Sequence, residues 1–414
     1  MKKRMLVYAN YFYPEVASTS QILTELCQDL QKDFEITVIC AVPCYTGKIE
    51  DRYKKEKFYY ENLDNIKILR VRVPEFSKTN KKSRIKHIIT YFFNSIKATR
   101  KIGKQDIVYT ISQPPILGGL LGFIGKKITK GKLVYNIQDF NPEQINAVSY
   151  SKNKLLIKVL LKIDKFVCKK SDLIITVGRD MQQTLINRFN NKKVPNNTVI
   201  NNWMDETSVY PLEKSNKKIV EFKKKYELDN KFIIMYSGNV GLYYDLENLV
   251  TIFEKYKDNK DVVLAIIGEG AVKEKLIEYC RKHDMNNVKF IPYQDKSDLI
   301  YSLNAADIHL VTNAKGIKGV SVPSKIYGCM ATNVPVFGIL EEGSEAWQII
   351  ESSNCGVLAE TGNYKQIEEV LDKIVKDKEK LVSKHLTGRK YLEDNFTRDK
   401  SIEKYRKELK KIVK

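Results

Sequence analysis

The stretch Phe232-Ile-Ile-Met-Tyr-Ser-Gly-Asn-Val-Gly-Leu-Tyr-Tyr-Asp-Leu-Glu-Asn-Leu-Val250 decides the fold, because it has the pattern of a buried strand, a glycine-bearing turn and a helix. Gly238 and Gly241 allow the backbone to approach a ligand closely. A helix that begins near Asp245 directs free N–H groups and the positive end of its dipole toward the same place. The segment predicts an anion-binding loop suited to a phosphate. The alternative is an ordinary strand–turn–helix connection without a ligand.

The same alternation of short apolar runs and helical stretches extends along the whole chain. The first series of predicted strands covers residues 5–9, 34–40, 66–73, 106–110, 132–136 and 172–177. A second series covers residues 232–236, 262–267, 288–291, 308–311, 334–337 and 356–358. Continuous apolar strands that alternate with helices are typical of parallel sheets covered by helices on both faces. The sequence therefore predicts an α/β protein with two parallel sheets.

The pattern resets near residues 195–212, which predicts a domain boundary. We expect an N-terminal Rossmann-like domain over residues 1–197 and a C-terminal Rossmann-like domain over residues 198–388. A last helix over residues 389–414 is expected to pack back on the first domain. Ligands of open parallel sheets bind at the carboxyl ends of the strands. Two facing Rossmann-like domains would then place a site in a central cleft.

The composition argues against several other classes of protein. Among 414 residues, 71 Lys and Arg exceed 50 Asp and Glu, which gives a net charge of +21. This excess is spread along the chain, and no helix-turn-helix, zinc-knuckle or RNA-recognition pattern accompanies it, so we expect no nucleic-acid partner. The seven cysteines form no Cys-x-x-Cys pair and the four histidines have no ligand-like spacing. These features favour reduced thiols and no metal site.

One segment departs from the even spread of charge. Between Lys78 and Lys104 there are nine basic residues and no acidic ones. On a helix, six apolar side chains of this segment fall on one face: Ile85, Ile88, Ile89, Phe92, Phe93 and Ile96. A basic amphipathic helix suits an anionic membrane surface, whereas an apolar stripe also suits packing on a sheet. We expect the stripe to belong to the core and the basic flanks to contact lipid headgroups. No run approaches the ~18 apolar residues that span a bilayer.

Five motifs, in this order, resemble those of one enzyme family. They are Ala9-Asn-Tyr-Phe-Tyr-Pro-Glu15, Tyr135-Asn-Ile-Gln-Asp-Phe-Asn-Pro-Glu143, Tyr236-Ser-Gly-Asn-Val-Gly241, Ile266-Ile-Gly-Glu-Gly270, and Val322-Pro-Ser-Lys-Ile-Tyr327 with Met330-Ala-Thr-Asn-Val-Pro-Val336. The whole chain resembles a GT-B glycosyltransferase of the large retaining family 4. Within it, the chain is similar to bacterial capsule and O-antigen members related to L-fucosamine transferases.

The resemblance implies an activity and a set of partners. We expect transfer of an N-acetylated or deoxy amino sugar from a UDP-linked nucleotide donor to a lipid-linked or glycan acceptor in surface polysaccharide synthesis. The resemblance makes residues 1–197 the acceptor-side domain and residues 198–388 the nucleotide-sugar-binding domain. It implies retention of anomeric configuration and no metal or other cofactor, in agreement with the absence of an Asp-x-Asp motif from the sequence. With no signal peptide expected, we place the protein in the cytoplasm, peripherally on the inner face of the membrane. The alternative is a nucleotide-sugar epimerase or hydrolase on the same fold.

The chain also departs from the family. Asn239 and Tyr244 stand where many members have an Arg and a Lys that neutralise the donor diphosphate. Val320 and Gly328 stand where many have two glutamates, the second of which holds the ribose. We expect Lys325 to replace the missing phosphate charge, at a helix start that Ser324 caps. A solvated surface lysine is the alternative.

The predicted site residues fall into three groups. Asp139 and Glu143 are the candidate catalytic acids, because they follow the end of a strand where active-site loops belong. A turn-capping role for Asp139 is the alternative. The candidate acceptor-binding residues are Asn10, Tyr11 and Glu15. The candidate donor-binding residues are Gly238, Asn239, Gly241, Gly268, Tyr293, Ser324, Lys325 and Glu345. Gln138 is a weaker candidate, and Tyr293 is equally compatible with a plain aromatic at a strand end.

Overall fold

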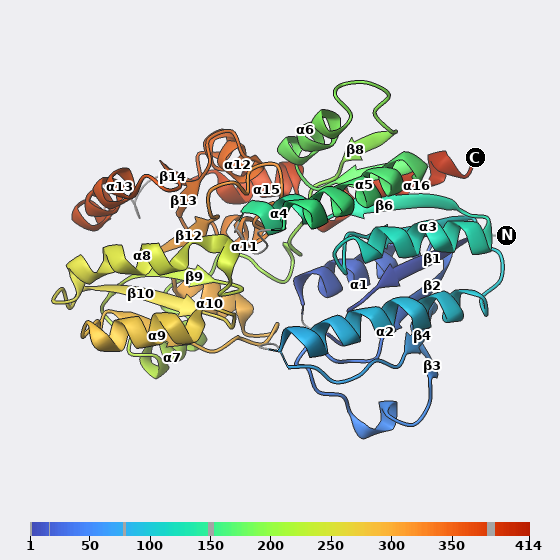
Figure 1. Cartoon of the computed structure of the whole chain (residues 1–414). Coiled ribbons are helices and arrows are strands. Elements are labelled where there is room, and N and C mark those ends of the chain that lie inside the picture. The colour runs from blue at the N-terminus through green and yellow to red at the C-terminus, as the bar shows by residue number, and fades with distance from the viewer. Residues whose placement is uncertain (1, 16, 78–79, 148–152, 379–385) are drawn as a thin grey trace. The chain divides into compact units, whose positions relative to one another are not determined.

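The structure is a computed structural model that describes residues 2–15, 17–77, 80–147, 153–378 and 386–414. It divides into two compact units (Figure 1). The first comprises Met1–Asn201 with Asp399–Lys414, and the second comprises Asn202–Arg398. The C-terminal region expected as one helix over residues 389–414 contains two. Helix α15 (Gly388–Asn395) belongs to the second unit, and nearly all of α16 (Arg398–Ile412) belongs to the first.

The first unit is built on a sheet that has eight strands in the described part of the chain. Their spatial order is β3 (Phe58–Leu63), β4 (Ile66–Val71), β2 (Phe34–Ala41), β1 (Lys3–Ala9), β5 (Ile107–Ile111), β6 (Lys132–Ile137), β7 (Leu173–Thr176) and β8 (Asn197–Val199). Every pairing is parallel except that of β3 with β4. Strand β3 was not predicted, because its side chains are only partly buried and form no apolar run.

Helices cover this sheet, and one of them lies unusually close to it. The helices of the first unit are α1 (Ser18–Leu30), α2 (Lys81–Thr99), α3 (Leu117–Thr129), α4 (Asn141–Ala147), α5 (Lys154–Lys170), α6 (Arg179–Arg188) and α16. Helix α3 packs against both α2 and α5. At Gly122 of α3 an added Cβ would lie 2.4 Å from Cγ2 of Thr110, so glycine lets α3 approach β5.

Helix α2 turns a different face to the sheet than the sequence predicted. Its buried side chains are those of His87, Tyr91, Ser95, Ala98 and Thr99, and Thr99 hydrogen-bonds the Tyr8 hydroxyl of β1 at 2.6 Å. The expectation that the apolar stripe belongs to the core is therefore wrong, since its members are partly or well exposed. Small and hydroxyl-bearing side chains allow the close approach to the sheet that the bulky stripe would prevent. Lys78, the predicted start of the basic segment, lies outside the described residues.

The second unit has a parallel sheet of six strands in its described part. Their spatial order is β11 (Val288–Ile291), β10 (Val262–Ile267), β9 (Phe232–Ser237), β12 (Ile308–Thr312), β13 (Val336–Leu340) and β14 (Gly356–Glu360). The helices are α7 (Lys217–Lys225), α8 (Leu246–Phe253), α9 (Lys273–Lys282), α10 (Leu299–Ala305), α11 (Lys325–Thr332), α12 (Glu345–Ser353), α13 (Tyr364–Lys376) and α15. Alternate residues of β9 belong to different apolar clusters, as expected of a strand covered on both faces.

In the described residues, none of the helices has the length and apolar character needed to cross a membrane.

Candidate active site

The first unit has a pocket at the carboxyl edge of its sheet. Strand β1 lies between β2 and β5, so the connections on its two sides lead to opposite halves of the sheet. Such a switch point leaves a crevice beside the ends of the central strands. A pocket of about 220 Å³ occurs there. Its lining residues are Asn10, Tyr11, Phe76, Arg84, His87, Ile88, Gln113, Pro114, Pro115, Asp139, Asn141 and Gln144.

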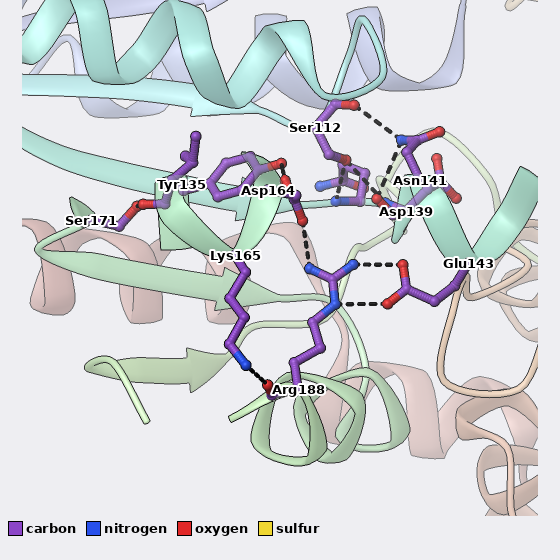
Figure 2. A network of polar contacts seen from close by, with 11 residues as sticks. Ser112, Tyr135, Asp139, Asn141, Glu143, Asp164, Lys165, Ser171 and Arg188 are labelled. Carbon is purple, nitrogen blue, oxygen red and sulfur yellow. Dashed lines mark hydrogen bonds and ion pairs between the residues drawn. The ribbon is translucent and has the colours of Figure 1, made fainter. Parts of the chain in front are cut away.

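Asp139 lies in this pocket, held from the loop after β5. The Ser112 hydroxyl oxygen accepts hydrogen bonds from the backbone N–H groups of Gln138 and Asp139, both at 3.1 Å (Figure 2). The side-chain amide of Gln144 donates to Oδ1 of Asp139 at 3.4 Å, a long hydrogen bond. Asp139 is partly exposed. These contacts fix the backbone at Asp139 while the carboxylate faces the pocket.

Asn10 and Tyr11 follow β1 and line the same pocket. Asn10 is only 6% exposed, and its Oδ1 has no hydrogen-bond partner in the described part of the chain. A buried acceptor without a donor is uncommon, because its desolvation is not offset. Burial is the main cause, and the neighbouring Cys44 the second, that raises the pKa of the Tyr11 phenol well above its usual range. The hydroxyl therefore stays protonated. The pair therefore offers a ligand one acceptor and one donor.

Glu15, the third predicted acceptor-side residue, is not among the residues that line the pocket. Its carboxylate accepts hydrogen bonds from the backbone N–H groups of Cys44 and Tyr45, the second at 2.8 Å. The Tyr45 ring in turn contacts the Tyr11 ring edge-on, with centroids 5.4 Å apart. Glu15 therefore supports the pocket wall through the loop after β2.

Glu143 belongs to a buried ion-pair network rather than to the pocket lining. Both of its carboxylate oxygens accept from the Arg188 guanidinium of α6, at 2.7 and 2.5 Å (Figure 2). Arg188 also pairs with Asp164 of α5 at 2.5 Å and lies over the Phe140 ring, 4.2 Å from its centroid. Tyr135 of β6 donates to the other oxygen of Asp164 at 2.8 Å. Burial alone would lower the Arg188 pKa, but the two carboxylates outweigh burial and raise this pKa above its usual range.

The network gives Glu143 a positioning role for α4. A bidentate arginine–carboxylate pair fixes both geometry and charge, and here it joins the first turn of α4 to α6. Because Asp139 lies two residues before the start of α4, the pair also holds the loop that carries Asp139. The side-chain amide of Gln138, the weaker candidate, donates to Oδ1 of Asn136 at 2.6 Å. Asn136 donates to the Tyr405 hydroxyl of α16 at 2.7 Å.

Sequence reasoning missed several pocket residues. Arg84 and His87 come from α2, and Gln113 comes from the loop after β5. Among the described residues, the Arg84 guanidinium makes no ion pair. Burial lowers the His87 pKa, and that ring contacts the backbone carbonyl of Pro74 at 3.1 Å. Arg84 had been counted only as part of a basic flank, because the sequence does not say which turn of α2 reaches the pocket.

In the second unit the predicted glycine loop follows β9 and packs on the loop after β10. The N–H of Gly238 donates to the carbonyl of Ile267, and that of Val240 to the carbonyl of Glu269, both at 2.9 Å. At Gly268, φ is +136° and an added Cβ would lie 2.0 Å from the Gly238 carbonyl oxygen. Glycine at position 268 is therefore required by the packing of the two loops.

Lys325 reaches this loop from the first turn of α11. Its Nζ donates to the Tyr236 hydroxyl at 3.1 Å and lies 4.4 and 3.8 Å from the ring centroids of Tyr236 and Tyr244. An added Cβ at Gly238 would lie 3.3 Å from Cε of Lys325. In the described part of the chain Lys325 has no carboxylate partner. Burial lowers its pKa to about 7, and the nearby Cys329 thiol opposes that shift.

The position of Lys325 answers the departure from the family pattern at residue 244. Tyr244 stands where many members of the resembling family have a lysine, and the ammonium group of Lys325 lies on the face of that tyrosine ring. A cation over an aromatic face is stabilised by the ring quadrupole. The structure thus places a lysine ammonium group beside residue 244, from the first turn of α11.

The remaining donor-side candidates also follow strands of this sheet or begin its helices, and each has different surroundings. Asn239 is in the glycine loop, and its carbonyl accepts from the Tyr236 hydroxyl at 2.7 Å. Tyr293 follows the edge strand β11 and is 51% exposed. Glu345 is the first residue of α12 and is buried. The expected capping by Ser324 is wrong, because its side chain makes no cap hydrogen bond and its own backbone is already helical.

Gly328, which stands where the sequence lacks the second glutamate, lies close to two flexible side chains. An added Cβ would lie 3.1 Å from Cε of Met204 and 3.4 Å from Cδ1 of Leu303. A longer side chain would have to displace this packing, and Gly328 is buried within α11. A side chain at this position would therefore require Met204 and Leu303 to shift.

Comparisons with known proteins find similar glycosyltransferases. Residues 218–390 match the family described as "Glycosyl transferases group 1". The probable glycosyltransferase WbjE of Pseudomonas aeruginosa is 26% identical over 344 residues, covering 80% of this chain and 81% of that protein. The putative colanic acid biosynthesis glycosyl transferase WcaI of Escherichia coli K12 is 24% identical over 365 residues, covering 84% and 86%.

A solved structure carries the same fold. The Anabaena protein HepE, determined in complex with UDP-glucose, has a TM-score of 0.72 and 13% identity, over 99% of this chain and 100% of that chain. The two parallel-sheet units described above are those of a GT-B protein. The chain is therefore a glycosyltransferase with the GT-B fold, and residues 218–390 of its second unit match the glycosyl transferases group 1 family.

Proposed function

We propose that this glycosyltransferase takes its sugar from a UDP-activated donor, and that Lys325 binds the donor diphosphate. The observation that carries the proposal is a cation beside the glycine loop with no carboxylate to neutralise it in the described residues. A diphosphate supplies that missing negative charge. The solved complex of HepE with UDP-glucose supports uridine as the nucleotide.

The chemistry needs charge stabilisation at the leaving group. As the bond between sugar and phosphate breaks, negative charge grows on the diphosphate. The Lys325 ammonium and the glycine-loop backbone next to Gly238 lie on the same side of the sheet edge. A preorganised cation at that place lowers the barrier without rearranging during the reaction. The remaining donor-side candidates, Asn239, Gly241, Tyr293 and Glu345, would contact the base, ribose or sugar.

The acceptor pocket of the first unit supplies the second half of the reaction. We assign Asp139 to the acceptor hydroxyl or to the positive charge that develops on the sugar, and Asn10 Oδ1 to a second hydroxyl of the acceptor. Glu143 positions α4 through Arg188. The reaction proceeds with retention and without a metal ion, the leaving phosphate accepting the proton of the acceptor. Retention, the absence of a metal ion and the role of the leaving phosphate follow from the family resemblance alone.

The sugar and acceptor are proposed from the same resemblance. We assign an N-acetylated or deoxy amino sugar, as in L-fucosamine transferases, and a lipid-linked glycan acceptor used in surface polysaccharide synthesis. The similarity to a colanic acid biosynthesis protein supports the polysaccharide. The proposed location is the cytoplasmic face of the inner membrane, held in part by the basic charge of α2.

A two-stage experiment tests the proposal. The first stage measures thermal stabilisation and calorimetric binding by UDP, GDP and their sugars, because a ligand that binds only the native state raises the apparent stability. The second stage analyses products with and without lipid-linked acceptor, in EDTA and in Mg²⁺, and assigns the anomer by NMR. UDP stabilisation and acceptor-dependent transfer in EDTA support the proposal. Stabilisation by GDP alone contradicts the UDP assignment. Isomerised or hydrolysed donor that forms equally well without acceptor would establish the epimerase or hydrolase alternative.

A further inference from the structure

Exposed apolar side chains gather on two helices of the first unit. In the described residues, fourteen large hydrophobic side chains are well exposed, and seven of them lie on α2 and α5. Those of Ile85 and Phe93 are 56% exposed, and that of Leu155 is 73% exposed. Such a concentration is unusual, because exposed hydrophobic residues on a monomer are normally scattered singly.

The two helices present these side chains on the same side of the sheet. In α2 the exposed Ile85 lies two residues before the buried His87, and the exposed Ile89 lies two residues before the buried Tyr91. Two residues correspond to about 200° around a helix, so the isoleucines point directly away from the sheet. Helix α3 lies between α2 and α5 (Figure 1). Its Phe123 contacts Phe166 of α5 edge-on, with ring centroids 5.0 Å apart. The outer surfaces of the three helices are therefore continuous.

The charge of this three-helix face is almost entirely positive. Helix α2 contains five lysines and arginines, α3 contains two and α5 contains six. The acidic residue in these three helices is Asp164, which is buried against Arg188. Long basic side chains around an apolar surface can lie along it while their charged groups reach water or lipid headgroups.

We infer that the outer surface of α2, α3 and α5 is a docking face that inserts its apolar side chains into an anionic lipid surface. Lys126 of α3 is paired with Asp172 at 2.6 Å, and the remaining charge of the face is strongly basic. The combination of exposed aliphatic and aromatic groups with this basic charge fits the boundary between headgroups and acyl chains. A nucleic acid would use the charge but not the apolar groups. A protein interface is usually depleted in lysine.

Docking through this face would bring the pocket close to the lipid surface. His87 and Ile88 of α2 line the pocket, and the exposed Ile85 and Ile89 lie on either side of them in the sequence of the same helix. A lipid-linked acceptor could then enter the pocket from the plane of the membrane. This inference deepens the proposed function, since it identifies the surface that the membrane partner contacts, and it rests on that function for the acceptor.

The test compares two variants of α2 with one control. The apolar variant combines Ile85→Ser, Ile89→Ser and Phe93→Ser, and the charge variant combines Lys81→Ser, Lys82→Ser and Lys86→Ser. The control combines Lys217→Ser, Lys224→Ser and Lys225→Ser on the lysine-rich α7 of the second unit. Each full-length protein is sedimented with vesicles of phosphatidylcholine alone and with vesicles that also contain about 30% phosphatidylglycerol, which gives an anionic surface.

Insertion predicts that the apolar and charge variants each lose at least about tenfold in partitioning onto anionic vesicles, whereas the control stays within about twofold. It also predicts that a Phe93→Trp reporter shifts its emission to shorter wavelength with anionic vesicles. Unchanged binding of the apolar variant, or no emission shift, would overturn insertion. So would a dimer in light scattering that the apolar variant dissociates, because the face would then bind a second copy.

The same preparations separate this inference from the proposed function. UDP binding is measured without vesicles for wild type and every variant. Vesicle binding with no UDP binding leaves the docking face intact and contradicts the donor assignment. UDP binding with no loss of vesicle binding in the α2 variants contradicts the docking face alone.

Discussion

Arg188 in the first unit and Lys325 in the second are two cations largely withdrawn from water, but their surroundings are opposite. Arg188 has two carboxylates, Glu143 and Asp164, and an aromatic face. Lys325 has two aromatic faces, a phenol and, in the described residues, no carboxylate. At Arg188 the two carboxylates outweigh burial and raise the pKa, whereas at Lys325 burial lowers the pKa to about 7. A cation with its charge satisfied internally stabilises the fold, whereas one without a counter-ion is available to a ligand anion.

The largest expected effect comes from removing the satisfied cation. Arg188→Met leaves Asp164 buried and Glu143 without its bidentate partner, and breaking one side of a buried ion pair costs about 3–5 kcal/mol. We expect a loss of this size in the free energy of unfolding, measured with urea. Glu143→Gln is the milder control, because Asp164 still pairs with Arg188. A loss below about 1 kcal/mol in Arg188→Met would remove the structural distinction between the two cations.

The next effect concerns the acid beside the network. Asp139→Asn keeps the Ser112 contacts, which involve only backbone N–H groups of residues 138 and 139. Turnover should fall by roughly a hundredfold with unchanged UDP affinity, as for a positioned acid or base. Steady-state kinetics and calorimetry measure the two quantities. If the mutant instead unfolds and its folded fraction retains normal turnover, Asp139 is a turn-capping residue.

Removing the unsatisfied cation should weaken binding without lowering stability at pH 7. Lys325→Met should weaken UDP binding by at least about tenfold, equivalent to ~1.4 kcal/mol. Lys273→Met is a matched control, because Lys273 is paired with Glu269 at 2.6 Å after the neighbouring strand, and its UDP affinity should change less than about twofold. Both affinities come from calorimetry. Equal losses in the two variants would mean that the missing carboxylate does not distinguish Lys325.

The stability of Lys325→Met has a definite dependence on pH. The folded pKa of Lys325 lies near 7 and below its unfolded value of about 10.4, so the unfolded state binds more protons between these values. The contribution of Lys325 to wild-type stability therefore rises with pH from about 7 to about 10, and below 7 the lysine remains destabilising. The variant should lack this rise and be at least as stable as wild type at pH 7. Urea unfolding at pH 6, 7, 8 and 9 measures the difference, and a less stable variant at pH 7 would contradict the assignment.

The sequence predicted the parallel sheets and the glycine loop well, because each depends on local signals. Apolar runs such as residues 262–267 identify a strand, and Gly238 and Gly241 identify a turn. Lys325 could be proposed because the charges missing at Asn239 and Tyr244 needed a substitute. That it lies on the face of Tyr244 depends on the meeting of α11 with β9, which no local pattern specifies.

Three features could not be predicted for the same physical reason. Helix α2 has two usable faces, and the choice of the one with Tyr91 and Ser95 depends on the fit to β1 and α3. Arg188 is far from Glu143 and Asp164 in sequence, so the network that occupies Glu143 leaves no local signal. The pocket position of Arg84 follows from how α2 docks.

The most direct test of the central claim is UDP affinity between pH 6 and 9 in wild type and Lys325→Arg. The titratable groups that face Lys325 in the described residues are Tyr236, Tyr244 and Cys329. Burial raises the pKa of Tyr236 and of Cys329, so both stay neutral between pH 6 and 9. Terminal phosphates ionise with a pKa near 6, so UDP itself changes little above pH 7. If Lys325 binds the diphosphate, wild-type affinity should fall above pH 7 by up to about tenfold per unit, with proton uptake on binding, while Lys325→Arg stays nearly flat. The same pH dependence in both proteins would contradict the claim.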